Sequence, residues 1–206
     1  MKRLLDVLLL STLLLLSAGC VDLSRPALAK HYYLLDAVPK PVDEPPAHAG
    51  AIRVTGIEVS APFSERTLVY RLDKERYESD FYDEFFVAPR AMVTSEMVEW
   101  LRVRRVFAIT LPPSSTLDAP YALEGQVTAM YGDLRDKDKT EAVFSIQVFV
   151  THMGNPDRAI VLQRTYDQRV RVADRSADAI TKGLSEALQQ SLAQLEADLR
   201  ALQLTP

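Results

Sequence analysis

The chain has 206 residues, of which 48% are hydrophobic and 25% are charged, the proportions of a globular protein. Its formal net charge of −4 gives it no general attraction to nucleic acid or to anionic lipid surfaces, so we expect no nucleic-acid partner. The chain contains one cysteine, which excludes a disulfide within it.

Residues 1–19 have the features of a secretory signal peptide. Lys2 and Arg3 give a positive start, and the mostly apolar run from Val7 to Leu16 is shorter than the roughly 20 residues that a transmembrane helix needs. The next segment, Ser17-Ala18-Gly19-Cys20, resembles the bacterial lipobox, in which the cysteine after the cleavage site receives lipid. We therefore expect cleavage just before this cysteine and a mature chain of 187 residues.

Cys20 is predicted to be the lipid attachment site. The alternative is a spectator thiol, but a secreted protein has little use for one unpaired cysteine, and acylation removes it. Acyl chains such as palmitate would give a permanent anchor in membrane lipid, because each buried methylene contributes about 0.8 kcal/mol. Residues 20–30 then form a tether. Val21 stands where an aspartate would retain an enteric lipoprotein in the inner membrane, which favours the outer membrane and leaves the inner membrane as the alternative.

The rest of the chain, residues 31–206, is expected to form a single periplasmic domain. Its first half alternates short apolar runs with polar or proline-rich loops. These runs predict strands at residues 31–35, 51–59, 67–72 and 106–111. A spacing of three and four predicts a helix over 91–103, with Trp100 in the core.

The second half is more regular. Long alternating runs at 121–131, 141–150 and 160–172 predict an antiparallel meander. Leucines at steps of three and four then predict a long C-terminal helix, which Asp174 or Ser176 would cap. We expect this helix to pack on the sheet, with a coiled-coil seam as the alternative. These elements alone predict an α+β fold.

Residues 76–86 carry five aromatic side chains interleaved with acidic ones. One strand face cannot bury so many rings, so this stretch is the strongest candidate for contact with a partner or with lipid. Tyr82, Phe85 and Phe86 are the candidate contact residues. The alternative is that the aromatic residues belong to the core and the acidic residues face solvent.

The sequence offers little for catalysis. His31, His48 and His152 are not at metal-ligand spacing, and no nucleophile elbow, P-loop or dinucleotide-binding motif is present. Three aspartates between 133 and 138 lack the pattern of a calcium loop and are expected at a solvated hairpin tip. We therefore expect no catalytic residues, no metal and no cofactor. A lipoprotein hydrolase is the alternative that these absences disfavour.

Several segments together resemble the ABC-type transport auxiliary lipoprotein family. After the lipobox, Tyr32-Tyr33-Leu34-Leu35 is similar to an early strand of the family, and Leu68-Val69-Tyr70-Arg71 is similar to its Val-Tyr-Arg signature. The passage from Tyr82 to Pro89 resembles a family segment with a tryptophan before the proline, although Phe86 stands at that place here. The late helix rich in leucine and alanine fits as well.

The resemblance implies a three-layer α/β fold with a mixed sheet that includes antiparallel strands, and a non-enzymatic role. The protein would be an auxiliary component of an ABC transporter that moves phospholipid or other hydrophobic molecules. Its partners would be an MCE-domain protein and the permease and ATPase of the inner membrane. A different class of function, a lipid-anchored scaffold or regulator of cell-wall synthesis or outer-membrane assembly, is the alternative. The sequence leaves self-association open.

Overall fold

The computed structural model describes residues 29–37, 39–154 and 159–204. The predicted signal peptide and Cys20 lie outside these residues. The strands are β1 (His31–Tyr33), β2 (His48–Val59), β3 (Thr67–Arg71), β4 (Tyr77–Phe85), β5 (Phe107–Leu111), β6 (Tyr121–Asp133), β7 (Glu141–His152) and β8 (Ile160–Arg171). The helices are the short η1 (Ala61–Phe63), α2 (Pro89–Val103) and α3 (Ala177–Ala201). The predicted elements agree with these bounds to within a few residues.

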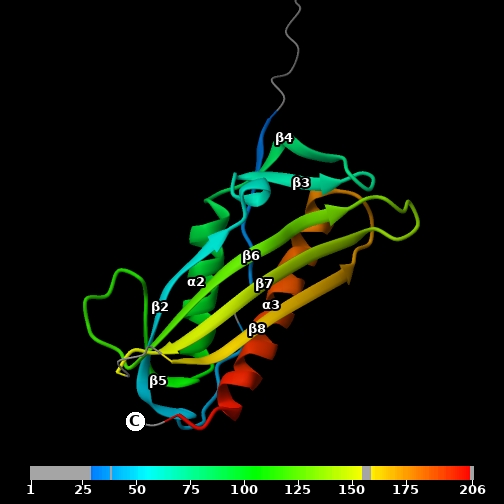
Figure 1. Cartoon of the computed structure of the whole chain (residues 1–206). Coiled ribbons are helices and arrows are strands. Elements are labelled where there is room, and N and C mark those ends of the chain that lie inside the picture. Colours follow the sequence, from blue (N-terminus) through cyan, green and yellow to red (C-terminus); the bar gives the residue numbers. More distant parts are fainter. Residues whose placement is uncertain (1–28, 38, 155–158, 205–206) are drawn as a thin grey trace, which may run out of the picture.

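All eight described strands join in one mixed sheet with β6 near its centre (Figure 1). One edge of β6 pairs along its length with β7 in antiparallel register, and β7 pairs in the same way with β8, as the meander prediction required. The other edge of β6 is divided between two parallel neighbours. Its first half pairs with β2, and its end, at Gly132 and Asp133, pairs with β3.

The remaining strands extend the two branches. β5 lies parallel to the first half of β2, whereas β4 pairs with β3 in antiparallel register and β1 pairs with β4 in parallel. Gly56 marks the break predicted within β2. Its φ of 140° is a backbone conformation that glycine adopts readily, and the register between β2 and β6 shifts there. The sheet therefore contains parallel pairs that local sequence patterns do not reveal.

The C-terminal helix packs on the meander, as predicted. Ser176 caps α3 by accepting a hydrogen bond from the Ala179 N–H at 3.2 Å. The leucine stripe of α3 is buried in the same core as the inward-facing side chains of β6, β7 and β8. The buried members of this stripe are Leu184, Leu188, Leu192, Leu195 and Leu199. Burial against the sheet excludes a free coiled-coil seam.

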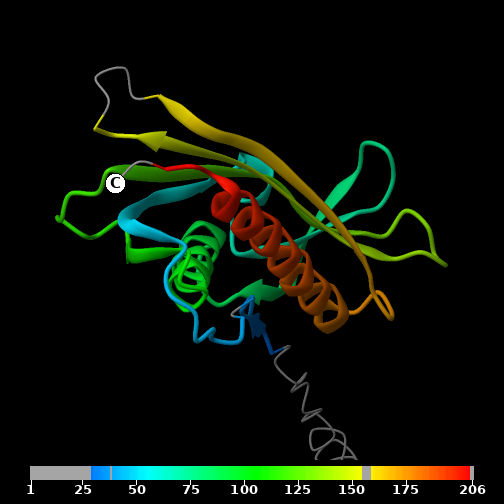
Figure 2. The same ribbon diagram turned by 90° about the horizontal axis from the view of Figure 1, so that it is seen from below.

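Both helices lie on the same side of the main sheet (Figure 2). On α2, the Thr94 hydroxyl faces β2 and accepts a hydrogen bond from the Ile57 N–H at 3.0 Å. Met92 is two residues earlier, about 200° around the helix, and its sulfur accepts a contact from the Leu35 N–H at 3.2 Å. The chain after β1 thus crosses the side of the helices that faces away from β2.

These contacts give a sheet, a helix layer and a partial third layer made by the chain that follows β1. The α/β class, the mixed sheet and the packed C-terminal helix are confirmed. The parallel pairing of β2 and β3 with β6 favours the α/β description over the α+β one. Trp100 is buried in the core, as predicted.

Candidate functional site

The aromatic stretch singled out in the sequence forms a bulged strand. Between two register points, β3 advances from Thr67 to Val69 while β4 runs from Glu84 back to Ser79. Between these two pairs β3 advances by two residues and β4 by five, so the extra residues of β4 form a protruding bulge. Asp80 holds this bulge, because its Oδ1 accepts hydrogen bonds from the Tyr82 N–H at 2.8 Å and the Asp83 N–H at 3.1 Å.

The bulge and the neighbouring strand expose an unusual number of rings. We define the aromatic patch as four residues with their exposed fractions: Phe81 (69%), Phe86 (60%), Tyr32 (51%) and Tyr82 (38%). Two edge-to-face pairs organise the patch, Phe81 with Tyr82 at 5.1 Å and Tyr32 with Phe86 at 6.1 Å between centroids. Exposed Leu34 and Val87 extend it.

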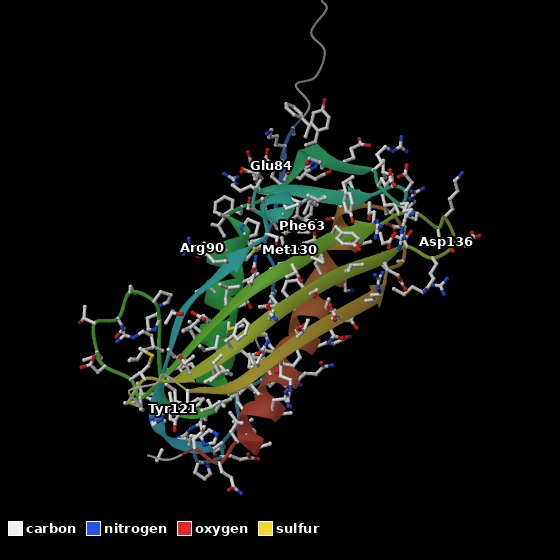
Figure 3. All side chains as sticks on the ribbon, in the orientation of Figure 1. Phe63, Glu84, Arg90, Tyr121, Met130 and Asp136 are labelled. Carbon is white, nitrogen blue, oxygen red and sulfur yellow. The ribbon has the colours of Figure 1, made fainter. Side chains whose placement is uncertain are left out.

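Charged side chains connect the two ring pairs. Lys30 Nζ lies 4.8 Å from the centre of the Phe81 ring, and the Arg66 guanidinium lies 5.5 Å from that of Tyr32. Glu84 lies between these cations, forming an ion pair with Lys30 and another with Arg66 at 3.6 Å. Glu84 is labelled at the β1–β4 end of the molecule (Figure 3). The patch is therefore one surface, crossed by paired charges.

One of the three predicted contact residues does not belong to this surface. Phe85 is 1% exposed and packs in the core, because it follows Glu84 on the strand and points to the opposite face. Its N–H donates to the Arg66 carbonyl at 2.6 Å. Tyr82 and Phe86 do reach the surface, and the structure adds Phe81 and Tyr32. The bulge explains the exposure of Phe81, which regular alternation would place on the buried face with Phe85.

The start of β1 is fixed beside the patch by Asp83. This carboxylate accepts a hydrogen bond from the Tyr33 hydroxyl at 3.1 Å and lies 2.9 Å from His31 Nδ1. Burial, with the hydrogen bond and charge of Asp83, raises the pKa of Tyr33 to about 12. Tyr33 therefore stays protonated as a donor at physiological pH, and β1 remains attached to β4.

A second polar cluster lies between the helices, far from the patch. Glu196 of α3 accepts hydrogen bonds from Trp100 Nε1 at 2.9 Å, from Arg104 Nε at 2.8 Å and from Arg200 Nε at 2.9 Å. Burial alone would raise the pKa of Glu196, but these hydrogen bonds lower it below its usual range. The cluster therefore joins α2 to α3 through the Glu196 carboxylate.

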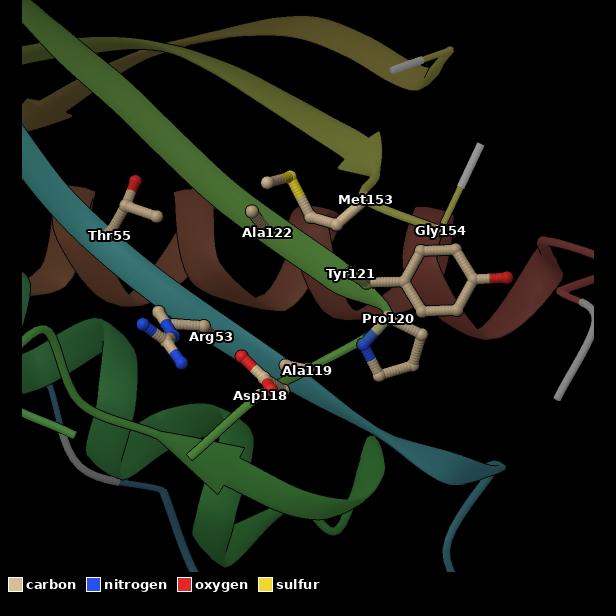
Figure 4. A pocket seen from close by; sticks show the side chains of 9 residues that line it. All are labelled: Arg53, Thr55, Asp118, Ala119, Pro120, Tyr121, Ala122, Met153 and Gly154. Atoms are coloured by element: carbon tan, nitrogen blue, oxygen red, sulfur yellow. The ribbon is translucent and has the colours of Figure 1, made fainter. Parts of the chain in front are cut away.

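A hollow of about 550 Å³ lies where β2 and β6 meet the preceding loop (Figure 4). Its lining includes Arg53, Thr55, Asp118 and Met153. The Arg53 guanidinium donates to the Leu117 carbonyl, and the Thr55 hydroxyl donates to the Leu123 carbonyl at 3.1 Å. The main chain thus holds the Arg53 and Thr55 side chains within the hollow.

The histidines are separated in the fold. His48 Nε2 is 2.8 Å from the Leu199 carbonyl, and His152 stacks on Tyr121 at 4.9 Å, whereas His31 is at the patch. Within residues 29–37, 39–154 and 159–204, no three histidine, cysteine or carboxylate side chains are grouped as a metal site. Asp133 is buried and paired with Arg135 at 2.7 Å, so this aspartate does not belong to the exposed hairpin tip that was expected.

The structure is a small α/β domain with an exposed aromatic surface, and sequence comparison identifies its family. A family model described as ABC-type transport auxiliary lipoprotein component matches residues 33–196. The chain belongs to this family. No curated protein sequence matches it. Among the helices that the structure describes, none is long and apolar enough to cross a membrane.

Solved structures share the fold at low sequence identity. A Xanthomonas campestris protein is 14% identical with a TM-score of 0.70, over 80% of this chain and 92% of its own. An uncharacterized protein is 16% identical with a TM-score of 0.66, over 83% of this chain and 99% of its own. A hypothetical protein from Chlamydia trachomatis is 10% identical with a TM-score of 0.53, over 75% and 99% of the two chains.

Proposed function

We propose that this protein is the lipid-anchored auxiliary component of an MCE-type ABC transporter that moves phospholipid or another hydrophobic molecule. The observation that carries the proposal is the family match over residues 33–196, on a chain whose Cys20 ends a lipobox. A lipoprotein of an ABC system works beside a permease and an ATPase. The sequence contains no P-loop, which fits an ATPase supplied by another chain.

The proposed role is non-enzymatic. Arg53 and Thr55 in the hollow donate to main-chain carbonyl groups, and Glu196 accepts hydrogen bonds from three side chains. The domain would thus act through its surfaces, by binding the MCE-domain protein and holding it near a membrane. Val21 supports attachment to the outer membrane, from which the domain would face the periplasm.

The test is affinity purification of the full lipoprotein from native membranes after mild crosslinking, followed by mass spectrometry. We expect an ABC ATPase, a permease and an MCE-domain protein to be recovered. A second envelope lipoprotein, purified with the same tag at the same level, controls for proteins that associate with any membrane anchor.

Recovery of cell-wall synthesis or outer-membrane assembly proteins, without the transporter, would contradict the proposal. The family fold would then serve a scaffold of another envelope machine. Turnover of phospholipid or peptidoglycan by the purified protein would contradict the non-enzymatic role.

A further inference from the structure

The aromatic patch lies at the end of the domain nearest to the expected anchor. Lys30 and Tyr32 belong to the patch region, and Cys20 precedes Lys30 by ten residues. Ten residues span at most about 36 Å when fully extended, and less in a flexible chain. A membrane that holds Cys20 is therefore within reach of the patch at all times.

The chemistry of the patch suits the boundary between headgroups and acyl chains. Tyrosine and phenylalanine rings place apolar area in the lipid, while tyrosine hydroxyls and neighbouring cations stay with headgroups and water. Phe81, on the protruding bulge, is the most exposed of the four rings. Lys30 and Arg66 flank the rings at cation–π distance, so they can meet lipid phosphates without leaving the surface.

The local charge indicates how such a contact would be driven. Lys30 and Arg66 are offset by Glu84, with which both pair, and by Asp80 and Asp83 of the bulge. The surface has no cationic excess that would select anionic lipid or give a strong dependence on salt. Apolar burial of the rings must supply the attraction, which a zwitterionic phospholipid satisfies.

We propose that the aromatic patch, Tyr32, Phe81, Tyr82 and Phe86, enters the headgroup region of the bilayer that holds Cys20. This second contact fixes the orientation of the domain on the membrane. This membrane contact rests on the acylation of Cys20 that is part of the proposed function. The anchor makes the contact intramolecular, so a modest intrinsic affinity suffices to keep it populated.

Spin labelling tests this directly, because acylation of Cys20 leaves any introduced cysteine as the sole free thiol. Leu34→Cys places a label at the patch edge with all four rings intact, and Leu117→Cys places one at an exposed site in the loop before β6. The full lipoproteins are reconstituted in phosphatidylcholine vesicles. Accessibility to oxygen and to a water-soluble nickel chelate is then measured.

We expect the label at position 34 to gain oxygen access and lose nickel access, while the label at position 117 stays aqueous. Adding Phe81→Ser and Phe86→Ser to the Leu34→Cys protein should restore nickel access. Each lost ring lowers the equilibrium constant for membrane contact about tenfold. The shift should persist at high salt. Circular dichroism and intact mass verify the fold and the acyl chains of each protein.

Other results would overturn the inference. An anchored, acylated protein whose label at position 34 is as aqueous as that at position 117 has no membrane contact there. Dipolar coupling between labels would instead assign the patch to a second copy of the chain. If the label at position 34 became shielded only after transporter was added, the aromatic patch would be assigned to protein docking. A protein without acyl chains would remove the anchor itself, and the mass spectrum would identify that failure separately.

Discussion

Glu196 shows how a single residue joins distant parts of the chain. Its carboxylate is 8% exposed and binds Trp100 and Arg104, which lie more than 90 residues earlier in the chain, together with Arg200 of its own helix. Removing one charge of a buried ion pair leaves the opposite charge buried without a counter-charge. The stability of the domain should therefore depend on this one carboxylate and on its ionisation.

Glu196→Gln should lower the free energy of unfolding at pH 7 by about 3 kcal/mol. The pKa of Glu196 is lowered in the folded state, so its contribution is complete above the unfolded value of about 4.3 and is lost as the pH falls through the folded value. The difference between wild type and variant should thus shrink below about pH 4.3. Urea unfolding at pH 7 and at pH 3.5 measures both values.

Glu186→Gln is the matched control, because Glu186 lies exposed on the same helix. Its substitution should change stability by less than about 0.5 kcal/mol. A Glu196→Gln variant with the stability of wild type at neutral pH would show that the cluster makes no net contribution.

At the scale of elements, the β4 bulge depends on Asp80. Besides the two backbone N–H groups of the bulge, its carboxylate accepts a hydrogen bond from the half-buried Tyr70 hydroxyl at 3.0 Å. Burial and the nearby Asp80 charge raise the pKa of Tyr70, so this hydroxyl remains a donor at physiological pH.

Asp80→Ala should lower the free energy of unfolding by about 1–3 kcal/mol, because the Tyr70 hydroxyl and two N–H groups lose their acceptor. Asp80→Asn keeps an acceptor oxygen and should cost less. Asp136→Ala is the control, since Asp136 caps a similar turn in an exposed loop, where its Oδ1 accepts from the Asp138 N–H. Equal urea midpoints for Asp80→Ala and Asp136→Ala would contradict a special role for the bulge.

Helix α3 approaches the sheet closely at Gly183. A Cβ added there would lie 2.4 Å from Val172 Cγ1 and 2.7 Å from Ala142 Cβ. Gly183→Ala should therefore destabilise the domain by about 1–3 kcal/mol through overpacking, although alanine is the better helix former by about 1 kcal/mol. Thermal unfolding measures the effect. Lys182→Ala, at an exposed neighbour, should leave the midpoint nearly unchanged, and a more stable Gly183→Ala would refute the close contact.

The elements differ in how far the sequence could predict them. The long strands and α3 were predictable because alternation and helical spacing are strong over ten or more residues. The parallel pairing of β2 with β6 was not, since partners far apart in sequence leave no local pattern. Phe85 was misplaced because two adjacent strand residues, Phe85 and Phe86, cannot both face outward, and Phe81 was missed because the bulge after Ser79 shifts the strand faces. Asp80, an acceptor two residues before Tyr82, was the available turn signal.

At the scale of the whole molecule, Cys20 is the proposed lipid anchor. Cys20→Ser should prevent acylation and move the protein from the membrane fraction to the soluble periplasmic fraction, because the patch alone is a weak contact. Fractionation followed by immunoblotting measures this. Ser17→Ala is the control, since it keeps a small residue before the cleavage site. A Cys20→Ser protein that stays membrane-bound would contradict the anchor.

The divided edge of β6 also has a consequence for the order of folding. β2 reaches its partner across 69 residues, from Ile52 to Tyr121, whereas β6, β7 and β8 close through short loops. Local pairings form faster than distant ones. We therefore expect the meander and α3 to fold first and the distant parallel pairings, among them that of β2 with β6, to form later. An exported chain would then present Cys20 to the lipidating enzymes while the neighbouring strands are still unfolded.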